Sequence, residues 1–299
     1  AAPKLVADRD IDRLMNTGEF TFVLQIPPYF ERDLLAGRQP SLQLVVDATA
    51  MAQAGIGSGY AQQIITNEIT RFLSHASATV GNSVPLDLRL AFNPNSDPSW
   101  FISVMGIINN INILAIILAG AAVVREREHG TLDHLLVMPL TPFEIAMSKI
   151  WANGLIMTVA VALSLYFVVR GFVGVPITGS IPLFLCGAVI YLFFATSIGI
   201  FLGTVARSMP QLGLLLILVA LPMNMLSGAN TPIQSMPPLL RTIMNASPST
   251  HFVSIGQAIL YRGASFDIVA LDFLIVAVIG AVFLWIAALR FRQMTRTAS

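Results

Sequence analysis

The pattern of apolar and polar residues changes sharply near residue 99. Before that point, apolar residues alternate with polar ones or recur at helical spacing in short segments. After it, long apolar stretches follow one another almost to the C-terminus. We therefore expect a small water-exposed domain over residues 1–99 and a lipid-embedded domain over residues 100–299.

The short segments of residues 1–99 predict an α/β domain. The predicted strands are rich in β-branched or alternating apolar residues, and the predicted helices carry an apolar face. A glycine-rich stretch, Gly55–Gly59, is expected to be a flexible turn. The predicted strands are 20–26, 42–46 and 86–92, and the predicted helices are 29–35 and 61–73.

The long segments of residues 100–299 predict five membrane spans, because a bilayer needs about 20 mostly apolar helical residues. Pro210 and Pro222 bracket the fourth and weakest one. Residues 228–267 are too polar and Pro-rich to cross, and they predict a re-entrant segment with short helices near 237–244 and 251–260. The predicted spans are 100–124, 150–169, 181–205, 210–227 and 268–289.

Composition supports a predominantly α-helical polytopic membrane protein. Only 11% of the 299 residues are charged, against about 25% in soluble domains. The net charge is +1, which gives no field that would attract nucleic acid. Cys186 is the single cysteine, so no disulfide can form within the chain.

The distribution of Lys and Arg predicts the orientation in the cytoplasmic membrane. Seven of these residues flank the spans on the side of residues 125–149 and the C-terminus, and three flank them on the other side. The first side is therefore expected to be cytoplasmic, and residues 1–99 and 228–267 extracytoplasmic. Because an exported domain needs a route across the membrane, we also expect a helix before Ala1 and six spans in the intact protein.

Residues 125–149 combine elements that are typical of a rigid lever beneath the bilayer. A charged turn precedes Gly130, an apolar-faced helix is expected to stop at Pro139, and a capping box with proline at the first helical position begins the next helix. The alternative is a polar connector whose arginines extend to the membrane edge.

This segment resembles the cytoplasmic segment of ABC-2 type permeases. The similarity lies in Glu126-Arg-Glu-His-Gly-Thr-Leu-Asp, Leu-Leu-Val-Met-Pro-Leu and Pro-Phe-Glu-Ile. Ile26-Pro-Pro-Tyr-Phe-Glu-Arg-Asp-Leu35 and Pro248-Ser-Thr-His-Phe resemble other parts of the same family. Asp133 stands where glutamate is usual, and Ser148 where glycine is common.

The resemblance implies a permease subunit that docks on a separate ABC ATPase and pairs with a second permease chain, as a homodimer or a heterodimer. ATP and Mg would be bound by the ATPase, with no cofactor in this chain; a periplasmic adaptor is a further expected partner. The implied ATPase-coupling residues are Arg125, Glu126, Arg127, Glu128, His129, Gly130, Thr131, Leu132, Asp133, Leu135, Leu136 and Pro139, and the connecting helix contains Thr141, Pro142, Glu144 and Lys149.

The chain shows no sequence motif for catalysis of its own. It has no phosphate-binding G-x-x-x-x-G-K-[ST] loop, no pattern of paired histidines and no Cys/His cluster, so we expect neither catalytic residues nor a metal site. The polar residues expected within the spans include Asn109, Asn112 and Asn224, which are candidates for the transport pathway or for helix packing.

Two other functions are alternatives to ATP-driven export of a hydrophobic or amphipathic drug, lipid or glycan. An ion-driven secondary transporter needs ionisable groups within its spans, and away from their ends the predicted spans have none. A non-transporting membrane assembly factor is compatible with the composition, but it would leave the rigid lever of residues 125–149 without a role.

Overall fold

The computed structural model describes residues 4–18, 20–36, 38–49, 51–75, 85–92, 98–131, 141–229, 231, 233 and 236–298. The chain divides into two compact units, residues 1–101 and 102–299. The first unit contains a small mixed sheet and the second is built from long apolar helices. This architecture confirms the predicted fold class of a helical polytopic membrane protein with a small α/β portion.

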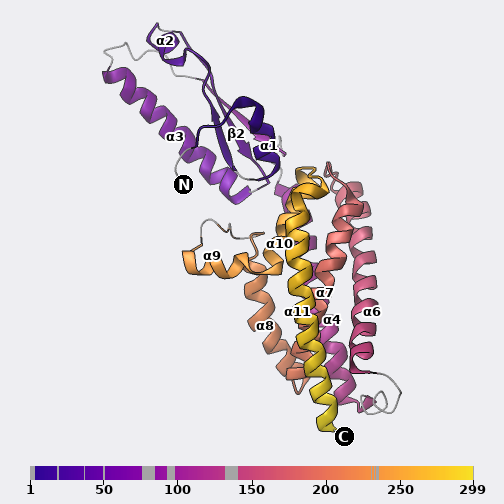
Figure 1. The fold of residues 1–299 in the computed structure, drawn as a ribbon. Helices are drawn as coiled ribbons and strands as arrows, with labels where there is room; N and C mark the ends of the chain where they lie inside the picture. Colours follow the sequence, from indigo (N-terminus) through magenta and orange to yellow (C-terminus); the bar gives the residue numbers. More distant parts are fainter. Residues whose placement is uncertain are drawn as a thin grey trace. The chain divides into compact units, whose positions relative to one another are not determined.

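The first unit is a three-stranded sheet with helices on both faces (Figure 1). The strand order is β1-β2-β3, with β1 antiparallel and β3 parallel to the central strand. Phe22 pairs with Val46, and Leu42 pairs with Leu86. The elements are η1 (Asp8–Asp10), α1 (Ile11–Asn16), β1 (Phe22–Gln25), α2 (Phe30–Leu35), β2 (Leu42–Asp47), α3 (Met51–His75) and β3 (Leu86–Ala91).

Side-chain alternation along β2 divides the core of the first unit in two. Leu44 and Val46 pack on the side of Ala61 of α3, whereas Val45 packs against Ile11 and Met15 of α1. Successive residues of a strand point to opposite faces, so β2 is buried on both sides. Four of the six residues of the central strand are accordingly apolar.

The expectation of a flexible turn at Gly55–Gly59 was wrong, because these residues lie inside α3. The helix starts ten residues before the predicted one. A Cβ atom at Gly57 would lie 2.3 Å from Cζ of Phe22 in β1. Glycine is therefore used here to bring the helix close to the sheet, and this tertiary contact outweighs the low helix propensity of glycine.

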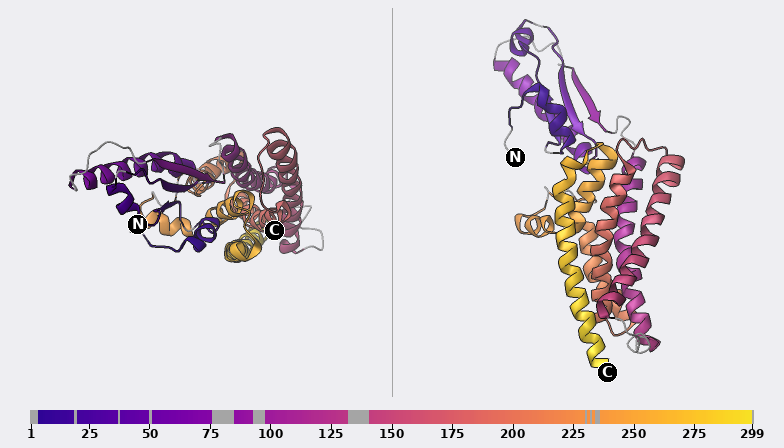
Figure 2. Two further views of the ribbon diagram at one scale, coloured as in Figure 1. Left: turned by 90° about the horizontal axis from the view of Figure 1, so that it is seen from above. Right: turned by 45° about the vertical axis from the view of Figure 1, so that its right-hand side comes forward.

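The second unit is a bundle in which α4, α6, α7 and α11 run side by side (Figures 1 and 2). Among the described residues, four helices are long and apolar enough to cross a membrane, namely 99–128, 143–172, 181–205 and 266–290. The elements are α4 (Pro98–Glu128), α6 (Pro142–Leu163), the π-helix η2 (Ser164–Phe172), α7 (Ile181–Val205), α8 (Met209–Met225), α9 (Pro238–Asn245), α10 (Pro248–Gly256), the π-helix η4 (Gln257–Tyr261) and α11 (Phe266–Ala298).

Helix α8 corresponds to the fourth predicted span, but it is shorter than expected. This apolar helix has 17 residues, from Met209 to Met225, and is about 26 Å long at 1.5 Å per residue. This is below the roughly 30 Å thickness of a hydrocarbon core. The prediction that this segment crosses the bilayer by itself therefore stays a prediction.

Short helices form in the segment between α8 and α11, as predicted for residues 228–267. Helices α9 and α10 each begin at a proline in the first helical turn, where the missing N–H group is not needed. Thr178, in the loop before α7, donates a hydrogen bond from Oγ1 to the carbonyl oxygen of Tyr261 at 2.7 Å. This contact ties the end of η4 to the bundle.

His251 of α10 connects α9 with α11 through both ring nitrogens. Nδ1 lies 2.7 Å from Oδ1 of Asp272, and Nε2 lies 2.8 Å from the carbonyl oxygen of Asn245. Both partners are acceptors, so both nitrogens must carry hydrogen for the two bonds to form. The hydrogen bond with Asp272 accordingly raises the pKa of His251 above its ordinary value, although partial burial opposes this.

The His251 bridge predicts stability that depends on pH. Because the folded pKa is raised, its contribution is complete below the unfolded pKa of about 6.5 and is lost as the pH rises through the folded pKa. We expect His251→Gln to lower the melting temperature of the detergent-solubilised protein at pH 6 and to have little effect at pH 9. The matched control is His129→Gln, at an exposed position; equal pH profiles for the two variants would contradict the prediction.

Helices α4 and α7 approach each other closely through glycine residues. A Cβ atom at Gly199 would lie 2.5 Å from the carbonyl oxygen of Ile116, and one at Gly203 would lie 2.8 Å from that of Gly120. Small residues allow such close packing of membrane helices, where dispersion forces replace the hydrophobic effect. The two helices are therefore in close backbone contact at these glycines.

Candidate coupling site at one end of the bundle

The charged residues 125–128 form the last turn of α4, whereas a separate turn was expected there. The helix continues to Glu128 and ends at Gly130, which has a φ of 68°. The N–H group of Gly130 donates to the carbonyl oxygen of Arg127 at 3.2 Å. Glycine adopts this left-handed conformation without a Cβ penalty, so it ends the helix here.

Glu126 connects α4 with α6 through an ion pair with Lys149. The side chains are 25% and 13% exposed, so the pair is largely shielded from water. A second oxygen of the carboxylate, Oε2, is buried and has no hydrogen-bond partner among the described residues. Shielding strengthens the attraction between the two charges relative to a surface pair.

Arg127 connects α4 with the C-terminal end of α7. Its guanidinium group donates to the carbonyl oxygens of Thr204, at 3.0 Å, and Ala206. The last carbonyl groups of a helix have no partner within the helix and carry its negative dipole end. The planar guanidinium group, a cation with several N–H donors, is therefore well suited to this position.

Glu128 connects α4 with the N-terminal end of α8. Its Oε1 accepts a hydrogen bond from the backbone N–H of Met209 at 3.0 Å. An acidic group at a helix N-terminus satisfies a free donor and interacts favourably with the dipole. Three successive residues of α4 thus hold three different helices. We name Glu126, Arg127, Glu128 and Lys149 the charged cluster.

The capping box predicted at the start of the connecting helix is confirmed. Oγ1 of Thr141 accepts from the N–H of Glu144 at 3.3 Å, and the carboxylate of Glu144 accepts from the N–H of Thr141 at 2.7 Å. Pro142 occupies the first helical position. The predicted leucine helix, with Leu132, Asp133, Leu135, Leu136 and Pro139, lies outside the described residues.

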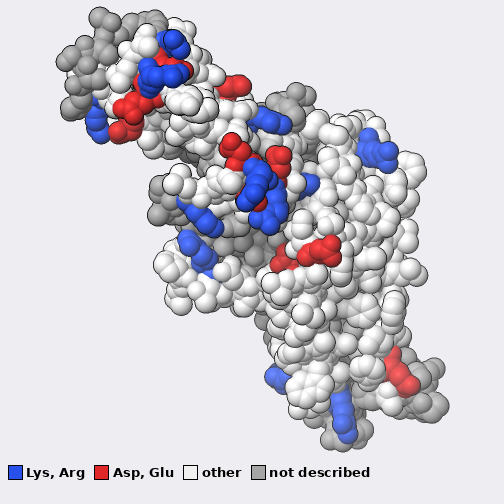
Figure 3. Space-filling view, turned by 45° about the horizontal axis from the view of Figure 1, so that its top comes forward, with Lys and Arg blue, Asp and Glu red and all other residues white. Residues whose placement is uncertain are grey.

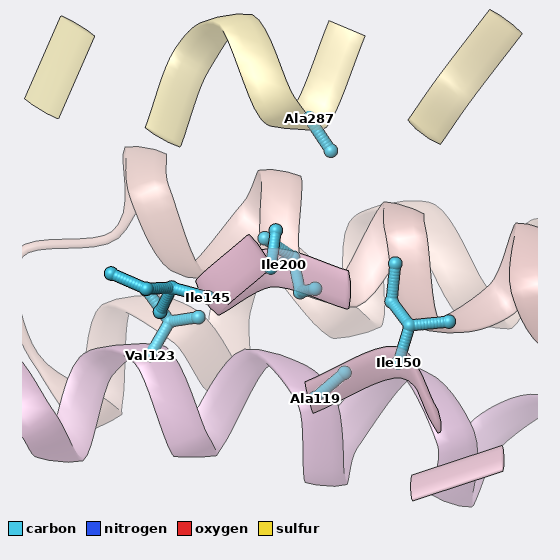
Figure 4. Close-up of a cluster of buried hydrophobic side chains, with 7 residues drawn as sticks. Ala119, Val123, Ile145, Ile150, Ile200 and Ala287 are labelled. Atoms are coloured by element: carbon cyan, nitrogen blue, oxygen red, sulfur yellow. The ribbon is translucent and has the colours of Figure 1, made fainter. Parts of the chain in front are cut away.

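A compact apolar cluster connects the same ends of α4, α6, α7 and α11 next to the charged cluster. Figure 4 shows Val123 and Ala119 of α4, Ile145 and Ile150 of α6, Ile200 of α7 and Ala287 of α11 in one packed group. Each of these side chains is at most 5% exposed. Figure 3 shows charged side chains gathered toward the ends of the helical unit with a broad uncharged surface between them.

The remaining predicted coupling residues lie near the surface. Arg125 and His129 are exposed, and Nδ1 of His129 lies 2.8 Å from the carbonyl oxygen of Arg125. Thr131 donates from Oγ1 to the carbonyl oxygen of Glu126 at 3.2 Å. The side chains of His129 and Thr131 thus bond the backbone of α4 itself, whereas the charged cluster bonds other helices.

The asparagines considered for the pathway lie between helices. Asn224 of α8 donates from Nδ2 to the carbonyl oxygen of Asn109 in α4 at 3.3 Å, and Asn112 is buried. Asn153 of α6 donates to the carbonyl oxygen of Ala115 at 3.0 Å. Within the described part of the chain, no group of three or more His, Cys, Asp or Glu residues could hold a metal ion.

Replacing Arg127 tests the connection between α4 and α7. We expect Arg127→Met to lower the free energy of unfolding by about 1.5–3 kcal/mol, because it removes hydrogen bonds made by a charged group. Arg127→Lys keeps the charge but not the planar set of N–H donors, so it should recover part of this loss of stability. Thermal unfolding in detergent measures both, with Arg125→Met as the exposed control. Equal melting temperatures for Arg127→Met and Arg125→Met would contradict the role.

Sequence reasoning identified the residues of the charged cluster but not their partners. Three of the partners are backbone groups, which carry no sequence signal of their own: the carbonyls of Thr204 and Ala206 and the N–H of Met209. The one available signal was position, because Thr204 and Met209 lie at the ends of two predicted spans. Helix ends always leave such groups unsatisfied.

Comparison with known proteins places this arrangement among transport permeases. The profile of a family described as "ABC-2 family transporter protein" matches residues 4–289. "Inner membrane transport permease YhhJ" of Escherichia coli (strain K12) is 55% identical over 295 residues, which make up 99% of this chain and 79% of YhhJ. The protein of the same name from Shigella flexneri gives the same values.

A more distant relative is "Probable multidrug ABC transporter permease YbhR" of Escherichia coli (strain K12). It is 30% identical over 267 residues, which cover 89% of this chain and 71% of YbhR. No solved structure matches the chain significantly.

Proposed function

Because this chain belongs to the ABC-2 family of transporter proteins, we propose that it is the permease subunit of an ATP-driven exporter. It is a multi-pass membrane protein of the transport type, and its relative YhhJ is named an inner membrane permease. In the proposed function, a separate ABC ATPase binds and hydrolyses ATP with Mg. The permease supplies the pathway and no catalytic group.

The charged cluster is the observation that carries the proposal. Glu126, Arg127 and Glu128 hold α6, α7 and α8 to the last turn of α4. A displacement of that turn therefore reaches three other helices at once. This geometry supports a transmission role for the cluster, while the exposed Arg125, His129 and Thr131 supply the surface on which an ATPase docks.

The direction, sidedness and cargo also belong to the proposal. Export of a hydrophobic or amphipathic molecule agrees with the apolar character of the spans and with the name of YbhR, a probable multidrug permease. The first unit and the segment after α8 lie outside the cytoplasm, and the C-terminus lies inside it. A second permease chain completes the pathway, and a periplasmic adaptor binds the first unit.

Transport in inverted membrane vesicles tests this function. Vesicles that contain the permease and its co-purifying ATPase should accumulate a lipophilic cationic dye when ATP is added. Orthovanadate should block the uptake, and a protonophore should leave it unchanged. ATP-independent uptake that a proton gradient drives would contradict the proposal and favour the secondary transporter.

A further inference from the structure

Asn112 of α4 and Asn224 of α8 each bury an amide oxygen that has no partner among the described residues. The side chains of Asn112 and Asn224 are 3% and 6% exposed. Oδ1 of each has no hydrogen-bond partner in the described part of the chain. Buried polar atoms are nearly always paired. Each orphaned acceptor therefore needs an explanation.

Asn224 contacts α4 at a position within one turn of Asn112. Asn224 bonds the carbonyl oxygen of Asn109, and Asn109 precedes Asn112 by three residues, on the same helix face. One turn earlier, Gln257 of η4 contacts the sulfur of Met105 at 4.0 Å. A thioether is a weak acceptor, so a third amide has only a poor partner here. We name Asn112, Asn224 and Gln257 the amide cluster.

We propose that the amide cluster recognises the polar group of the cargo, with the oxygens of Asn112 and Asn224 accepting hydrogen bonds from an N–H or O–H group. This inference rests on the proposed transport function and names the class of cargo. The cluster contains no ionised group, so recognition depends on hydrogen bonds and not on an ion pair. The ligand is an amphiphile whose head carries a donor and whose tail lies among apolar side chains.

Helix α8 provides a way to open the buried cluster. Pro222, two residues before Asn224, has no N–H group to donate to the helix, which weakens the helix at this point. At the other end of α8, Glu128 of the charged cluster holds the N–H of Met209. Motion of the charged cluster is therefore passed along α8 to Asn224, because the charged cluster and the recognition point contact the same helix.

Asn153 provides a matched control for a merely structural role. It is also an amide between two helices, with Nδ2 3.0 Å from the carbonyl oxygen of Ala115. Its oxygen is not among the buried atoms without partners. Asn153 thus makes an interhelical contact without burying an unpaired acceptor, which is what packing alone requires.

Binding of two matched probes to the purified permease–ATPase complex in nanodiscs tests the inference. Dodecylammonium has N–H donors, and dodecyltrimethylammonium has the same charge and tail but no donor. We expect the wild type to bind the first at least tenfold more tightly, a factor in the range of one hydrogen bond. Asn112→Val and Asn224→Val should reduce this preference to within about twofold.

The controls separate recognition from packing. Asn153→Val should leave the preference unchanged, and Asn112→Asp, which keeps an acceptor, should retain it. Equal binding of the two probes by the wild type, or binding of neither, would overturn the inference, as would an equal loss of preference in Asn153→Val. A complex that prefers dodecylammonium but shows no ATP-driven transport would instead contradict the proposed function.

Discussion

Reversal of the charge at Glu126 is expected to abolish coupling without releasing the ATPase. In Glu126→Lys, two cations replace the shielded pair between α4 and α6. Breaking a buried pair costs about 3–5 kcal/mol, and we expect about 2–3 kcal/mol here because a quarter of the Glu126 side chain is exposed. ATP-driven dye uptake should fall at least tenfold, while the ATPase still co-purifies.

The swapped pair provides the decisive control for this prediction. Glu126→Lys combined with Lys149→Glu restores opposite charges at the same two positions, so it should recover most of the uptake. Glu68→Lys, which disrupts an exposed surface pair with Arg71, should have no effect. If Glu126→Lys instead released the ATPase and the swap did not restore binding, Glu126 would contact the ATPase directly.

Enlarging Gly199 is expected to separate α4 from α7. Its Cβ would meet the carbonyl oxygen of Ile116 at 2.5 Å and Cβ of Ala119 at 2.8 Å. These are backbone or near-backbone atoms that cannot rotate away. Gly199→Ala should therefore already lower the free energy of unfolding by about 2–3 kcal/mol, in the range for overpacking. The melting temperature in detergent should fall by roughly 5–10 °C. Gly199→Leu should prevent stable folding.

Gly154→Ala is the matched control, because nothing lies within 4 Å of its added Cβ. Alanine is the better helix former by about 1 kcal/mol, so this variant should melt at the same temperature or higher. A melting temperature for Gly199→Ala equal to that of Gly154→Ala would show that the two helices do not pack as closely as described.

The spans could be predicted because membrane insertion depends on properties that are local in sequence. The third span, 181–205, has the same bounds in the sequence analysis and in α7. Ser180 caps it, accepting from the N–H of Leu183 at 3.4 Å, and Pro182 lies in its first turn. Length, hydropathy and caps all lie within one stretch of about 25 residues, so no distant contact is needed.

Predictions were less successful where tertiary packing overrides a local preference. Glycine favours turns in isolation, yet Gly57 lies in α3 because the ring of Phe22 requires the space of a side chain. The last turn of α4 differs from its prediction for a similar reason. Charges usually end a span, but Glu126, Arg127 and Glu128 each find a partner on another helix, so the helix continues.

The sequence by itself determined which segments form long apolar helices, where most of these helices begin, and that Glu126, Arg127, Glu128 and Lys149 carry charge near their ends. Only the tertiary structure decided that Glu126 pairs with Lys149. It also decided that Arg127 and Glu128 bind backbone groups of Thr204 and Met209, which are more than 75 residues away along the chain. The free energy of transfer into lipid is a sum over neighbouring residues of the chain, whereas a hydrogen bond needs two groups within about 3 Å of each other in space. That proximity is created by helix packing, through contacts such as those of Gly199 and Gly203.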